Sequence, residues 1–135
     1  MNEGWFGDEH FILFTPEESA EVSAKYAIEK LLPGFMVAGL RGWDDFLVKN
    51  AEGHTFTVPT VPVDPKHIRP IAVPEPTAKL KPDERLAGKI KWYLKPLAFG
   101  GDVADSNTNW VTHEQHQQLV AYWNKQYRAL KGMSA

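Results

Sequence analysis

The distribution of proline sets the strongest limit on how this chain can fold. Seven of its ten prolines lie between residues 59 and 82. Proline fixes φ and donates no backbone hydrogen bond, so this stretch cannot supply central strands or helix interiors. It also carries branched apolar residues among the prolines, namely Val61, Val63, Ile68, Ile71 and Val73. We therefore predict an extended connector that wraps over the body of one domain, with an edge strand near residues 68–73.

The part before the connector reads as one helix and four strands. Residues 9–14 form a short apolar run typical of a strand. Thr15, Pro16 and Glu18 then predict a helix start with a capping box, and this helix should run to about Lys25. Three more strands are expected at 35–40, 45–48 and 54–58, the first two joined by the tight segment 41–44 and the last two by a turn in which Gly53 supplies a positive φ.

The part after the connector predicts one strand and one long helix. Residues 89–98 alternate in part, and we expect Ile90, Trp92, Leu94 and Leu97 to point inward. Thr112 as N-cap and Gln115 at N3 begin the final helix. Its apolar stripe comprises His116, Leu119, Val120, Trp123, Tyr127 and Leu130. The whole pattern predicts a single α+β domain over 1–135, in which helices pack on a twisted, mostly antiparallel sheet.

Composition limits the classes of function. The 135 residues include no cysteine, so disulfides and thiolate nucleophiles are excluded, and no apolar run approaches the roughly 18 residues of a membrane span. We expect a cytoplasmic protein with no membrane partner. The net charge of −2 hides an uneven arrangement, because residues 1–31 sum to −5 and residues 66–95 to +5. A nearly neutral total gives no general case for nucleic-acid binding.

Few side chains suggest catalysis or metal binding. His113 and His116 are spaced so that they could share a helix face, and Asp102 and Asp105 lie in a turn-rich loop that could offer oxygen ligands. The same residues are also typical of a capping-turn histidine, a partly buried histidine and a loop of Asx turns. Serines occur outside any nucleophile elbow, and no phosphate-binding glycine motif is present. We expect no enzyme activity, no cofactor and no metal.

Aromatic residues are better candidates for recognition. Trp92 and Trp123 lie in apolar patterns, whereas Trp5, Trp43 and Trp110 fall in predicted turns or near a terminus, where an exposed tryptophan can anchor a partner or cover the edge of the core. Lys89, Lys91, Tyr93 and Lys95 share one parity, which suits either a solvent-facing strand side or a nucleic-acid surface. We favour the first interpretation.

The order of these elements resembles the SUKH superfamily, the Smi/Knr-type domain. The residues that carry the resemblance span about 11–72: the segment Leu13-Phe14-Thr15-Pro16-Glu17-Glu18, the strand start Leu32-Pro33-Gly34-Phe35, the acidic-aromatic strand Asp44-Asp45-Phe46-Leu47-Val48, and Gly53-His54-Thr55-Phe56-Thr57-Val58-Pro59. Bacterial proteins of this type are mostly immunity proteins that neutralise a toxin, often a nuclease, and fungal relatives are scaffolding regulators of cell-wall synthesis. The resemblance thus implies a protein-binding role without a catalytic residue.

Three functional hypotheses follow. The first is an immunity protein that binds a cognate toxin, as a monomer or weak homodimer, with candidate contact residues Trp43, Asp44, Asp45, Trp110, Asp102 and Asp105. The second is a small-ligand or metal-binding protein that uses His113, His116, Asp102 and Asp105. The third is a scaffold or regulatory domain that associates with itself through the proline-rich edge.

Overall fold

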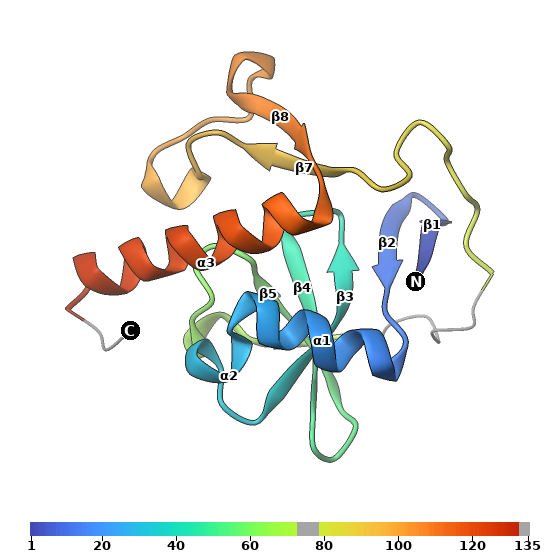
Figure 1. Cartoon of the computed structure of the whole chain (residues 1–135), viewed down its shortest axis with the longest axis horizontal. Helices are drawn as coiled ribbons and strands as arrows, with labels where there is room; N and C mark the ends of the chain where they lie inside the picture. Colours follow the sequence, from blue (N-terminus) through green and yellow to red (C-terminus); the bar gives the residue numbers. More distant parts are fainter. Residues whose placement is uncertain (73–78, 133–135) are drawn as a thin grey trace.

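Two antiparallel sheets and three α-helices make up the computed structural model, which describes residues 1–72 and 79–132 (Figure 1). The larger sheet is a six-stranded meander in chain order: β1 (Asn2–Phe6), β2 (Glu9–Leu13), β3 (Phe35–Arg41), β4 (Asp45–Asn50), β5 (Thr55–Pro59) and β6 (Arg69–Pro70). The smaller sheet pairs β7 (Ile90–Tyr93) with β8 (Thr108–Val111). The helices are α1 (Pro16–Tyr26), α2 (Ile28–Leu31) and α3 (His113–Leu130). The predicted α+β fold class is confirmed.

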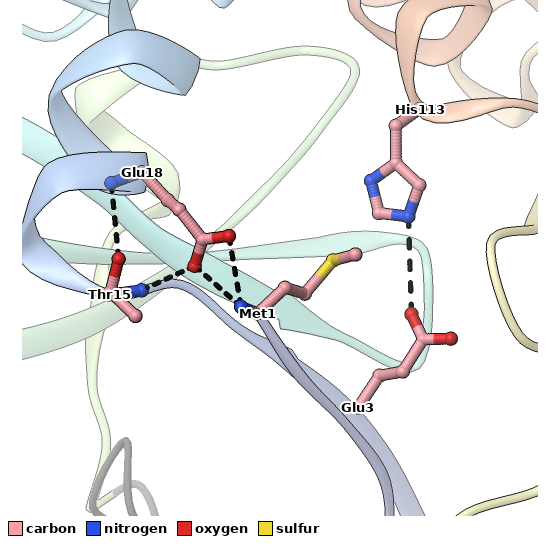
Figure 2. A network of polar contacts seen from close by, with 5 residues as sticks. All are labelled: Met1, Glu3, Thr15, Glu18 and His113. Carbon is pink, nitrogen blue, oxygen red and sulfur yellow. Dashed lines mark hydrogen bonds and ion pairs between the residues drawn. The ribbon is translucent and has the colours of Figure 1, made fainter.

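Both predicted capping boxes are present. The Thr15 hydroxyl accepts from the Glu18 N–H at 3.2 Å, and the Glu18 carboxylate accepts from the Thr15 N–H at 2.9 Å (Figure 2). At α3, Thr112 and Gln115 exchange the same pair of bonds, at 3.1 and 2.9 Å. Each box satisfies backbone donors that an α-helix leaves free in its first turn. The starts of both helices were therefore predictable to the residue.

The larger sheet is covered on both faces. On one face, α1 packs on β3 and against α3, and Figure 1 shows α1 crossing in front of the strands. On the other face, Phe11, Leu13 and Leu47 pack with Leu80 and Ile71 from the connector. In its described part the connector contributes the short edge strand β6 and places Ile71 and Leu80 on this face; Val73 lies outside the described residues.

Two serines of α1 form hydrogen bonds with strand β3 where its pairing with β4 is irregular. The pairing of β3 with β4 changes register between Val37 and Gly39. The Ser19 hydroxyl donates to the Val37 carbonyl at 2.5 Å, and the Ser23 hydroxyl accepts from the Val37 N–H at 2.8 Å. A bulge disrupts the local ladder, and side chains from the helix supply partners for Val37 there. These buried hydroxyls are therefore structural groups of the core.

The structure differs from the prediction at three places. Strands β1 and β8 were not predicted, because neither shows clear alternation, and their pairing with β2 and β7 defines them. The strand predicted over 89–98 ends at Tyr93, and Leu94 and Leu97 are exposed, since Pro96 cannot continue the ladder. Leu130 is exposed, not part of the buried stripe, since it is the last residue of α3.

Among the described residues, no helix combines the length and the apolar character required to cross a membrane.

Candidate functional site

A pocket lies where the turn between β3 and β4 meets the end of β5 and strand β7. Its volume is about 150 Å³. The lining residues are Trp43, Asp44, Asp45, Pro59, Thr60, Val61, Trp92, Tyr93, Pro96 and Leu97. Three of the predicted contact residues, Trp43, Asp44 and Asp45, therefore converge on one concave feature. Neither β7 nor the end of β5 was expected to complete it.

The turn that carries Trp43 has an unusual backbone. Gly42 has a φ of 59° and Trp43 a φ of 71°, both in the left-handed region. For a residue with a bulky side chain this conformation costs roughly 1–2 kcal/mol. Two hydrogen bonds hold the turn: the Gly42 N–H donates to the His10 carbonyl at 2.8 Å, and the Thr60 N–H donates to the Asp44 carbonyl at 2.9 Å. Strained residues often cluster at functional sites, which draws attention to Trp43.

An aromatic cluster supports Trp43 from behind. The His10 ring stacks on the Trp43 ring with centroids 4.8 Å apart, and Trp5 meets both rings edge-on. Trp110 of β8 contacts Trp43 at 5.5 Å and remains 42% exposed. Burial lowers the pKa of His10, against the opposing effects of Glu3 and Asp83. The His10 ring thus supports the Trp43 ring on one side, and Trp110 extends the aromatic surface outward.

The carboxylates of the two pocket aspartates have no partner within the described residues; Asp44 is exposed and Asp45 is half-buried. Neither the Asp44 nor the Asp45 carboxylate has a hydrogen bond or ion pair within residues 1–72 and 79–132. Partial desolvation beside the pocket walls raises the pKa of Asp44, although the residue is exposed overall; the charge of Asp45 adds to this, while Lys91 opposes it. Withdrawal from water likewise raises the pKa of Asp45, with Arg41 opposing. Within a strand, adjacent aspartates would face opposite sides, but Asp44 lies in the turn, so both residues line the pocket.

Asn124 of α3 ties the pocket to the core. Its side-chain amide donates to the Thr60 carbonyl at 2.7 Å and to the Val120 carbonyl at 2.9 Å, and its oxygen accepts from the Val63 N–H at 2.7 Å. Thr60 in turn binds Asp44 through its own N–H. A buried asparagine thus fixes the start of the connector, which forms one pocket wall. Asn124 was not among the predicted site residues, and its position beside the apolar stripe of α3 is the only signal that could have found it.

The histidines of the metal hypothesis occupy separate environments. His116 is fully buried, and its Nδ1 lies 2.5 Å from the Tyr26 hydroxyl. Burial lowers the pKa of His116 to about 3, helped by the proximity of His113. His113 faces Glu3 of β1, with 4.0 Å between Nε2 and the carboxylate (Figure 2), and burial lowers its pKa as well.

Asp102 and Asp105 lie in the exposed loop between β7 and β8. The Asp102 carboxylate accepts from the Ala104 N–H at 3.1 Å, and its carbonyl accepts from the Asn107 amide at 2.8 Å. These local bonds fit the Asx-turn interpretation. Neither residue lines the pocket. Within the described part of the chain, no group of three or more histidine, cysteine, aspartate or glutamate side chains is placed to hold a metal ion.

Alternate residues of the basic strand β7 face a buried side and a partly exposed side, as the sequence predicts. Ile90 and Trp92 are buried, whereas Lys91 and Tyr93 lie on the partly exposed side. The Lys91 ammonium is positioned over the Tyr93 ring, 5.5 Å from its centroid. This cation–π contact and the charge of the nearby Asp44 define the surroundings of Lys91.

Folding brings the acidic start of the chain beside the basic segment. Trp5 and Lys81 exchange backbone hydrogen bonds, both of 2.8 Å, and the Glu3 carboxylate accepts from the Gly88 N–H at 2.9 Å. The Trp5 indole donates to Asp83 at 3.3 Å. The donors in these contacts are backbone N–H groups and an indole, not Lys or Arg side chains, so hydrogen bonds rather than ion pairs join the two regions here.

Comparison of the chain with protein-family models, with characterised proteins and with solved structures found no match.

Proposed function

We propose that this chain is a non-catalytic protein-binding domain, and that its partner is a bacterial toxin, as its resemblance to SUKH immunity proteins implies. The observation that carries the proposal is the pocket at the β3–β4 turn, where two carboxylates, unpaired within the described residues, adjoin aromatic walls. Carboxylates that have no partner in the free chain can gain hydrogen bonds and ion pairs from another molecule.

The rim of the pocket supports the same role. Trp110 and Leu97 are 42% and 46% exposed, and both adjoin the pocket, Trp110 through Trp43 and Leu97 directly. Exposed tryptophans beside a concave feature are typical of the residues that dominate binding energy in protein interfaces. The proposed contact face therefore combines an apolar rim with an acidic centre, and the acidic centre would attract a basic toxin surface.

Co-expression of this chain with the product of its neighbouring gene tests the proposal. We expect a stable complex and protection of the host from that product. The variant Trp110→Ala should weaken the complex by at least about tenfold, in line with a buried aromatic anchor. The variant Tyr122→Phe, which changes an exposed ring on α3, serves as the control and should bind as the parent does. Absence of both binding and protection would refute the toxin partner.

A further inference from the structure

The size of the pocket narrows the choice of occupant. Its volume is about 150 Å³. Sites for cofactors and drug-sized ligands have volumes of about 300–1,000 Å³, whereas an apolar cavity of about 150 Å³ holds a single benzene. The pocket beside Trp43 therefore suits the end of one side chain.

The chemistry of the walls selects a cation. Trp43, Trp92 and Tyr93 contribute aromatic surface, and Asp44 and Asp45 contribute carboxylates that have no partner in the described part of the chain. Aromatic faces and carboxylates both attract positive charge. A guanidinium group suits this pair of walls better than an ammonium group. It is planar and weakly hydrated, stacks on rings, and donates hydrogen bonds in a fork that matches carboxylates.

The two nearest cations of the chain leave these carboxylates accessible. Arg41 is engaged with Glu9, with 3.1 Å between guanidinium and carboxylate. Lys91 is held over the Tyr93 ring and forms no ion pair with either aspartate, although its charge reaches Asp44. Both basic groups reduce the local negative charge, but neither forms an ion pair with Asp44 or Asp45 within the described residues. Space, charge and aromatic surface are thus all available to an incoming side chain.

We propose that the pocket binds an arginine side chain presented by the partner protein. This inference rests on the proposed function, because it assigns the central contact of the proposed binding face. The guanidinium would lie between the aromatic wall and the two aspartates, and the exposed rim at Trp110 and Leu97 would cover the remainder of the partner's surface. The partner would therefore present an arginine within a basic patch.

A titration with blocked arginine, N-acetyl-arginine-methylamide, tests the pocket without any partner protein. The indole N–H signals of Trp43 and Trp92 should shift saturably in nuclear magnetic resonance spectra. Blocked citrulline has nearly the same shape without the charge, and blocked lysine has the charge without the fork. Both should bind at least about tenfold more weakly. The proposal is overturned if arginine causes no saturable shift, or if citrulline or lysine binds as tightly as arginine.

Two double variants test whether the pocket carboxylates are responsible for arginine binding. Combining Asp44→Asn with Asp45→Asn should weaken arginine binding at least about tenfold, since both carboxylates are lost. Combining Asp102→Asn with Asp105→Asn changes the net charge equally but lies outside the pocket, and should leave binding unchanged. Equal losses in both variants would overturn the assignment. Arginine binding without a toxin complex would refute only the proposed function, and a toxin complex without arginine binding would refute only this inference.

Discussion

The pocket at the β3–β4 turn and the interior beneath α3 both hold polar groups, but these differ in burial and in their partners: Asn124 and His116 are buried, whereas Asp45 is half-buried and Asp44 is exposed. Beneath α3, Asn124 forms hydrogen bonds with both of its amide atoms, and the Nδ1 of His116 is joined to the Tyr26 hydroxyl, although its Nε2 has no partner among the described residues. At the pocket, Asp44 and Asp45 have raised pKa values and no hydrogen bond within those same residues. The interior groups are mostly satisfied by the chain itself, whereas the pocket carboxylates are not.

This difference separates stability from binding. A buried polar group with partners contributes to folding, and removal of one partner leaves the other unsatisfied. A carboxylate that is partly open to solvent and has no partner contributes little to folding, and it can gain an ion pair when a cationic ligand arrives. Substitutions beneath α3 should therefore change the free energy of unfolding, and substitutions in the pocket should change binding.

The largest effect is expected for Asn124→Ala. It would leave the Thr60 carbonyl and the Val63 N–H unpaired in the core, which should lower the free energy of unfolding by about 3 kcal/mol or more. Urea denaturation measures this change. Gln118→Ala, an exposed substitution on the same helix, should shift the value by no more than about 0.5 kcal/mol. Similar values for the two variants would contradict the structural role of Asn124.

A smaller loss is expected for Tyr26→Phe. This substitution keeps the ring and its contact with Phe46 but removes the hydroxyl that pairs with His116. One buried nitrogen then loses its partner, so the free energy of unfolding should fall by about 1–3 kcal/mol. Tyr122→Phe removes an exposed hydroxyl and serves as the matched control. A parent-like stability of Tyr26→Phe would show that the buried pair contributes nothing.

The pH dependence of stability should come mainly from the histidines. The pKa of His116 in the folded chain is about 3, so between there and its ordinary value of 6.5 the unfolded state binds an additional proton. The free energy of unfolding should therefore fall by up to about 1.4 kcal/mol per pH unit for this group as pH drops below 6.5. His10 and His113, also lowered in pKa, act in the same direction, whereas protonation of Asp44 and Asp45 acts against it.

Denaturation at pH 7.5 and at pH 5.5 tests this dependence. The variant His116→Gln keeps a polar side chain beside Tyr26 but cannot titrate, so its stability should change less between the two pH values than that of the parent. Equal changes in parent and variant would show that His116 does not control the acid response.

The smallest change in stability is expected in the pocket. Neutralisation of Asp44 and Asp45 by asparagine removes no hydrogen bond formed within the described residues, and solvent screening limits the repulsion that is relieved. The free energy of unfolding should stay the same or rise by no more than about 0.5 kcal/mol. A clear loss of stability would mean that these carboxylates serve the fold after all.

Removal of Lys91 offers a finer test of the same region. Its ammonium lowers the pKa of Asp44 and so competes with an incoming cation. Lys91→Gln should therefore tighten the binding of blocked arginine by about two- to threefold, equivalent to about 0.5 kcal/mol. Isothermal titration or the indole shifts would measure it. Weaker binding would indicate that Lys91 helps to form the site.

Local signals in the sequence predicted most of the fold. Capping boxes, prolines and alternation located both long helices and the strands from β2 to β5, since each depends on residues close together in the chain. Strands β1 and β8 could not be found in this way, because their pairing with β2 and β7 fixes them. In the site, Trp43, Asp44 and Asp45 were predicted from exposure and charge.

The rest of the site depends on contacts between distant segments. His10, Thr60, Trp92 and Asn124 meet the turn only after the sheet, the connector and α3 have packed together. No local sequence pattern identifies such residues. The exception is Asn124, because an asparagine beside the apolar stripe of α3 suggests a buried polar group. Asp102 and Asp105 show the opposite case. Their sequence suggested a binding loop, but Asp102 forms local hydrogen bonds and neither residue lines the pocket.

The most direct test of an open, unpaired acidic pocket is the titration of Asp44 and Asp45 themselves. Carbon-13 resonances of their carboxyl groups report each pKa, with Arg41, Glu9 and Lys91 as the charged neighbours. In the free protein both pKa values should lie above the ordinary value of 3.8, and saturation with blocked arginine should lower both, because a bound cation stabilises the charged form. Ordinary pKa values that arginine does not change would contradict the proposed role of the pocket.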